Sequence, residues 1–107
     1  MPKPQPWNTA DATDAIRAMG GNPRITLSYS VHAKEQMAER DLIIGDILYI
    51  LKHGFVLTDP KPATQPDLYK YRLETRTPNS NNRIVRAVVI PDPATCWIKV
   101  VTVMWVD

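Results

Sequence analysis

His32 is the side chain whose type and surroundings best suit proton transfer in this 107-residue sequence. It lies in the stretch SVHAKEQMAERDLIIGDILYILKHG, residues 30–54. If the stretch is helical, Glu35 and Glu39 follow His32 at i+3 and i+7 and share its polar side. A nearby carboxylate raises the pKa of an imidazole and fixes its tautomer, as a general acid or base requires. The alternative is a solvated histidine on an exposed helix face, and helical periodicity alone favours that interpretation.

Two further polar residues of this stretch have both a chemical and a structural interpretation. Arg40 could bind a phosphate, or it could pair with Gln36 and Glu39 on the surface of its own helix. His53 directly precedes Gly54, so we interpret it as a residue that stabilises the end of a helix through the helix dipole.

The histidines and the cysteine do not form a metal-binding pattern. His32, His53 and Cys96 lack ligand-like spacing, and no glycine-rich phosphate loop is present, so the sequence predicts no cofactor and no structural metal. Cys96 falls in a predicted strand, where we expect a buried and inert thiol. A single cysteine excludes an intrachain disulfide. Together with the lack of a signal-like N-terminus or a long apolar run, it favours a cytoplasmic protein.

Basic residues concentrate in the C-terminal part of the chain. The net charge is only +2, but residues 68–100 contain six basic side chains and two acidic ones. The six are Lys70, Arg72, Arg76, Arg83, Arg86 and Lys99. A basic face of this kind favours a polyanion such as nucleic acid. The alternative interpretation is ordinary solvation, since exposed strand faces often contain Lys and Arg.

Aromatic residues occur in the same part of the chain. Tyr69, Tyr71, Trp97 and Trp105 could stack nucleic-acid bases on a sheet face. Tyr69 and Tyr71, however, alternate with Lys70 and Arg72. We therefore expect the two tyrosines in the core and the two cations together on the opposite face, away from the helices.

The elements that must position these residues begin with helices. Residues 1–8 contain three prolines and predict a flexible N-terminal arm, followed by a single domain over residues 9–107. Thr9 is predicted to cap a short helix that stops at Gly20, and Ser30 to cap the helix that contains His32. A further helix, apolar on almost all sides, is predicted over residues 44–53.

Beyond Phe55 the period changes from helical to alternating. The segments FVLT, LYKYRLET, RIVRAVVI and CWIKVVTVMWV predict strands, separated by a proline-rich loop and polar turns. Helices followed by strands indicate an α+β fold. We predict two or three N-terminal helices packed on one face of a three- or four-stranded antiparallel sheet.

The helical motif also supports a family resemblance. The string H-A-x-x-x-M-x-E-R-D-L-x-x-x-D-I-x-x-x-L-x-x-G, from His32 to Gly54, resembles an uncharacterised bacterial domain family. The likeness covers roughly residues 28–106 and leaves the first predicted helix outside. That family is similar to the RelE-like and MqsR-like toxins of type II toxin–antitoxin pairs. The chain departs from the family pattern at Gln36, Asp41 and Ile43.

The resemblance implies a RelE-like ribonuclease-toxin fold that binds RNA across the open face of its sheet. It implies metal-free cleavage, in which the 2′-hydroxyl attacks the adjacent phosphodiester, and a protein antitoxin as a second partner. The catalytic residues it implies are His32, Arg40 and Arg86, and the nucleic-acid-binding residues are Lys70, Arg72 and Arg83. Two alternatives stay open: a non-catalytic module that binds nucleic acid or protein on the same fold, and a ParE-like gyrase inhibitor.

Overall fold

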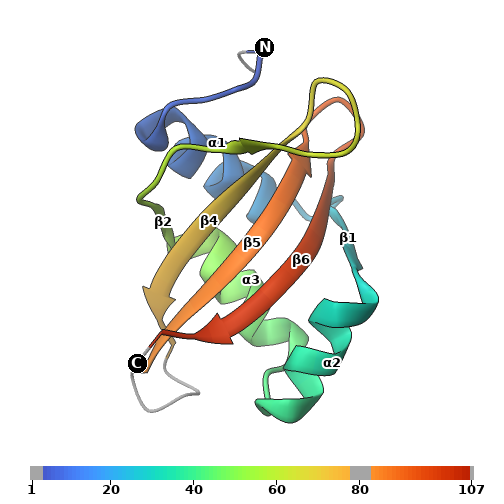
Figure 1. Cartoon of the computed structure of the whole chain (residues 1–107). Coiled ribbons are helices and arrows are strands. Elements are labelled where there is room, and N and C mark those ends of the chain that lie inside the picture. Colours follow the sequence, from blue (N-terminus) through green and yellow to red (C-terminus); the bar gives the residue numbers. More distant parts are fainter. Residues whose placement is uncertain (1–3, 78–82, 107) are drawn as a thin grey trace.

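The computed structural model describes residues 4–77 and 83–106, which form three helices and six strands (Figure 1). The helices are α1 (Thr9–Gly20), α2 (Val31–Glu39) and α3 (Ile44–His53). The strands are β1 (Thr26–Tyr29), β2 (Phe55–Val56), β3 (Lys61–Pro62), β4 (Tyr69–Arg76), β5 (Ile84–Asp92) and β6 (Trp97–Trp105). The α+β class is therefore confirmed.

Helices α1 and α2 begin at polar cap residues, close to where the sequence predicts them, whereas the cap residue of α3 is the apolar Ile43. Ser30 caps α2 as predicted, because its side chain accepts a hydrogen bond from Ala33 N. The cap of α1 is Asn8, whose Oδ1 accepts from Asp11 N at 2.8 Å, so the prediction of Thr9 was wrong by one residue. At the start of α3, the Asp46 carboxylate accepts a hydrogen bond from the backbone N–H of the N-cap residue at 3.0 Å.

The sheet is larger than predicted and is mixed. Its strand order is β1-β6-β5-β4-β2, and β3 pairs with β4 off this path. β4, β5 and β6 form the predicted antiparallel meander, but β1 pairs with β6 in parallel. The prediction of three or four purely antiparallel strands was therefore wrong. Parallel pairing joins segments that are far apart in sequence, so the short segment around β1 carries no local signal for it.

The helices cover one face of this sheet. In Figure 1, α1 and α3 lie behind the sheet, and the broad face of β4, β5 and β6 is turned toward the viewer. Alternate residues of these strands point into the core, as Tyr71 and Leu73 do from β4. The burial of Tyr71 confirms its predicted core position. The segment of residues 57–68 passes across the end of the sheet where β4 begins.

Helix α2 packs beside the sheet along β6 and β1. A helical wheel at 100° per residue places Gln36 on the polar side of this helix and Val31 on the apolar side. Both placements are wrong, because Gln36 is 7% exposed and Val31 is 73% exposed. The Gln36 Oε1 accepts a hydrogen bond from Val103 N at 2.8 Å, and the Ser30 hydroxyl donates to Val101 O. These bonds satisfy backbone groups of β6 beyond the end of β1, which protects an otherwise open strand edge.

Two sequence predictions about local backbone were also wrong. A glycine directly after a helix predicts a left-handed backbone that ends the helix, but Gly54 has a φ of −72°. Its role is steric, because a Cβ there would lie 2.5 Å from Ile50 O. Cys96 lies in the turn before β6, with a φ of 52°, and not in a strand; it is a half-buried free thiol.

Residues 4–8, which precede α1, pack on the domain. They belong to the N-terminal arm that the sequence predicts as flexible. Trp7 is 4% exposed and stacks on Tyr71, with ring centroids 5.4 Å apart. The Tyr71 hydroxyl accepts a hydrogen bond from Trp7 N and donates to the Gln5 side chain. None of the helices that the structure describes has the length and apolar character needed to span a bilayer.

Candidate nucleic-acid interface

The face of the sheet that the helices leave uncovered is built from the residues between the core positions. Strand register places Arg72 of β4 beside Val88 of β5, and Val88 beside Thr102 of β6. The next row is Glu74, Arg86 and Met104. All six side chains are partly exposed. We call this surface the open face.

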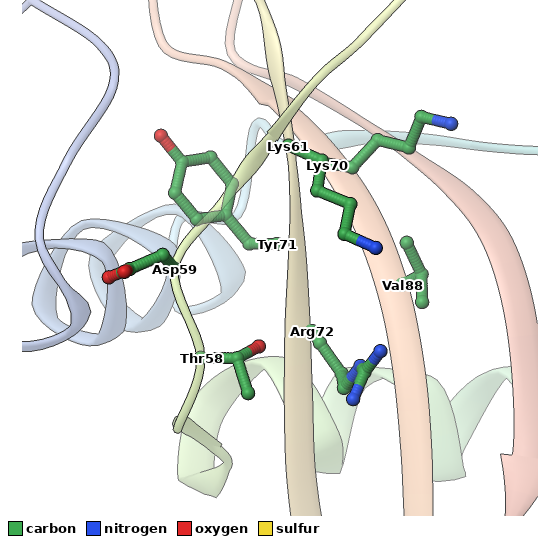
Figure 2. Close-up of a pocket in the computed structure, with 7 residues that line it drawn as sticks. All are labelled: Thr58, Asp59, Lys61, Lys70, Tyr71, Arg72 and Val88. Atoms are coloured by element: carbon green, nitrogen blue, oxygen red, sulfur yellow. The ribbon is translucent and has the colours of Figure 1, made fainter.

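A hollow of about 170 Å³ lies at the β4 end of the open face, beside β3. It is lined by Thr58, Asp59, Lys61, Lys70, Tyr71, Arg72 and Val88. Figure 2 shows the side chains of Lys61, Lys70, Arg72 and Val88 on one side of β4. The Tyr71 ring and the Asp59 carboxylate lie on the other side. The cations of the hollow therefore share one side of the strand, and its one lining carboxylate does not point at them.

Pairing of β3 with β4 brings the two lysines of the hollow together. Lys61 is the register partner of Lys70, and Arg72 follows on the same face of β4. Within residues 4–77 and 83–106, none of these three cations forms an ion pair. Three adjacent positive charges without a carboxylate partner repel one another and attract an anion. A phosphate suits the arginine in particular, because a guanidinium can donate two parallel hydrogen bonds to it.

Arg86 has a partner that the sequence does not predict. Its Nε donates to Glu74 Oε2 at 2.9 Å across the β4–β5 pair, and the two side chains are 26% and 19% exposed. The predicted catalytic role for Arg86 treated it as a free cation. The structure instead makes it half of an ion pair, one row away from Arg72 on the open face.

The helix residues of the predicted site lie apart from the hollow. His32 is exposed on α2, and in the described part of the chain it forms no hydrogen bond, ion pair or ring contact. Arg40 follows α2 and pairs with Glu39 at 3.3 Å, as the surface interpretation expected. Because α2 packs along β6 and β1, β5 and β6 lie between it and β4. No described contact joins His32 or Arg40 to Lys70 or Arg72.

The other predicted residues have structural contacts of their own. Arg83 precedes β5, at the end of the sheet away from the hollow, and its guanidinium lies 4.3 Å from the centroid of the Trp105 ring. The His53 ring lies 4.4 Å from the Tyr49 ring at the end of α3. The structure thus brings Lys70 and Arg72 together and adds Lys61, which sequence reasoning missed. Lys61 lies in the segment that the sequence predicts as a proline-rich loop. No local sequence pattern indicates that this segment pairs with β4.

Among the described residues, burial changes the pKa of two tyrosines, Tyr71 beside the hollow and Tyr29 on β1. Burial raises the pKa of Tyr71 above 10.0, and the hydrogen bond from Trp7 N acts in the opposite direction. Burial also raises the pKa of Tyr29, whose buried hydroxyl has no hydrogen-bond partner among the described residues. Both phenols therefore stay neutral and structural at ordinary pH. The described residues contain no group of three or more His, Cys, Asp or Glu side chains that could hold a metal.

Fold and site together define a small α+β domain with a helix-covered face and a basic open face. The chain belongs to a family described as a domain of unknown function, DUF4258, whose model matches residues 29–105. The match runs from the end of β1 through β6 and leaves α1 outside. It includes every residue that lines the hollow. No curated protein and no solved structure matches the chain.

Proposed function

We propose that this protein binds RNA across the open face of its sheet and cleaves it without a metal, as a RelE-like endoribonuclease. The observation that supports the proposal is the hollow, in which Lys61, Lys70 and Arg72 converge without an acidic partner among the described residues. Such a cluster attracts phosphates, and displaced counterions favour binding of a polyanion. The RelE-like resemblance of the His32–Gly54 motif points to RNA as the polyanion.

The reaction attributed to such toxins needs little from the protein besides charge and proton transfer. The 2′-hydroxyl of the RNA is its own nucleophile, so the enzyme supplies a base, an acid and cations around the pentacovalent phosphorus. The hollow supplies the cations. The resemblance also implies a protein antitoxin that suppresses the activity.

Replacing the three cations of the hollow tests the proposal. A labelled single-stranded oligoribonucleotide is titrated with the wild type and with the triple variant Lys61→Gln, Lys70→Gln, Arg72→Gln at several salt concentrations. Each phosphate contact contributes about 0.7 to the slope of log K against log salt for a single strand. We expect weaker binding and a shallower slope for the triple variant.

A control variant removes two positive charges outside the hollow. Lys34 and Lys52 are exposed on α2 and α3, outside the hollow, and neither forms an ion pair with a described residue. The double variant Lys34→Gln, Lys52→Gln should bind RNA nearly as tightly as the wild type. Equal losses in the two variants would mean that only net charge matters, and the proposed interface would be wrong.

A non-catalytic RNA-binding module is the second candidate. The observation that favours it is the position of His32, which has no described contact with the strand cations. Gel analysis of the RNA after incubation distinguishes the two candidates. Binding with specific cleavage supports the endoribonuclease, whereas binding of RNA that stays intact supports the module.

A further inference from the structure

Glu74 is an acidic side chain in the middle of a basic surface. It lies on β4 between Arg72 and Arg76 in sequence, and its register partner on β5 is Arg86. The neighbouring position on β6, beside Arg86, is Met104. Its carboxylate therefore lies among cations on the part of the sheet that the proposed function assigns to RNA.

In the ion pair between Glu74 and Arg86, each side chain keeps hydrogen-bonding groups that the pair itself does not use. Arg86 binds Glu74 Oε2 through its Nε, at 2.9 Å. Within the described residues, Glu74 Oε1 accepts no hydrogen bond, and the two Nη groups of Arg86 donate none. The pair is thus a carboxylate held in place on one oxygen, beside a guanidinium whose outer edge can still bind an anion.

The position of this pair relative to the hollow suits one phosphodiester. Arg72 lines the hollow and precedes Glu74 by two residues on the same face, a distance of roughly 7 Å along a strand. Arg86 lies on the adjacent strand, one row from Arg72. A phosphate that bridges Arg72 and Arg86 would have its ribose within reach of Glu74 Oε1.

We propose, as an extension that rests on the proposed function, that Glu74 is the general base of the cleavage reaction and that Arg86 and Arg72 bind the scissile phosphate. Glu74 Oε1 accepts the proton of the 2′-hydroxyl as the 2′-oxygen forms a bond to phosphorus. The bond from phosphorus to the 5′-oxygen breaks, and that oxygen takes a proton from water. The products are a 2′,3′-cyclic phosphate and a 5′-hydroxyl.

The ordinary role of such a pair is structural, since opposite charges on adjacent strands stabilise a sheet. Glu74→Gln separates the two roles. The amide oxygen of glutamine can still accept the hydrogen bond from Arg86 Nε, but an amide cannot take up the proton. The change also removes a negative charge beside the bound phosphate, so it should leave RNA affinity unchanged or increase it.

The experiment measures three quantities for each variant. They are the affinity for a labelled single-stranded oligoribonucleotide, its single-turnover cleavage rate, and the thermal midpoint of unfolding. We expect Glu74→Gln to lower the cleavage rate by about 10²–10⁴-fold, the usual contribution of a general base, with binding and thermal midpoint kept. Glu74→Asp should retain part of the rate. Asp14→Asn, which removes an exposed carboxylate from α1, is the control and should cleave normally.

The outcomes separate this inference from the proposed function. A Glu74→Gln variant that binds and cleaves like the wild type would overturn the role of Glu74 and leave the proposed function standing. If the wild type binds RNA but never cleaves it, the general base is refuted and the non-catalytic module is correct. If the wild type does not bind RNA, the proposed function itself is wrong.

Discussion

Replacing Gln36 by leucine tests how α2 is attached to the sheet. Gln36 is buried, and its Oε1 accepts the hydrogen bond of Val103 N at 2.8 Å. Leucine has a similar size but no acceptor, so the buried N–H would lose its partner. A buried donor without a partner costs about 1–3 kcal/mol. For a domain of about this size, each kcal/mol of lost stability lowers the thermal midpoint of unfolding by roughly 4–8 °C.

The assay is urea unfolding followed by circular dichroism. We expect Gln36→Leu to lower the midpoint concentration of urea without changing the slope m, because the surface exposed on unfolding stays the same. Glu35→Leu is the matched control, because it introduces the same side chain at an exposed position of α2 and should change stability by no more than about 0.5 kcal/mol. If Gln36→Leu unfolds at the wild-type urea concentration, the hydrogen bond to β6 does not hold α2 in place.

Three other predictions concern single residues. Gly54→Ala should lower the free energy of unfolding in urea by about 1–3 kcal/mol, because the added Cβ would collide with the backbone. Gly45→Ala in α3, where an added Cβ has room, should leave that free energy unchanged or raise it, and equal effects of the two changes would refute the reasoning. Burial raises the pKa of Tyr71 in the folded state above its ordinary 10.0, so the folded protein binds this proton more tightly than the unfolded chain. The contribution of Tyr71 to the free energy of unfolding should therefore be constant below pH 10 and fall as the pH rises further, and Tyr71→Phe should make the fall in stability above pH 10 shallower. His32→Ala should leave the cleavage rate close to that of the wild type if Glu74 is the base, whereas the sequence-based assignment expects a loss of about 10²–10⁴-fold.

Local sequence patterns predicted the helices and the meander well because these elements depend on neighbours in sequence. The bounds of α3 and the cap at Ser30 agree with the structure. Parallel pairing of β1 with β6 and the return of β3 onto β4 depend on contacts between distant segments, which periodicity does not encode. Gln36 was misplaced for a related reason: its buried amide is matched to a backbone group of β6, and a helical wheel scores it only as polar.

The candidate site could be predicted only in part from the sequence. Alternation in LYKYRLET indicated that Lys70 and Arg72 would share a face opposite the tyrosines, and the structure places them so. Lys61 and the pairing of Glu74 with Arg86 were missed, because both depend on the register between strands. A charge count over residues 68–100 treats a paired arginine and a free one alike.

An NMR titration of the ¹⁵N-labelled wild type with a single-stranded oligoribonucleotide tests the central claim most directly. If the open face binds RNA, amide shifts should change most at Lys61, Lys70, Arg72 and Val88, while α1 and α3 on the covered face stay nearly constant, and the changes should vanish at high salt. Changes concentrated on α1 and α3, or no changes at any RNA concentration, would contradict it.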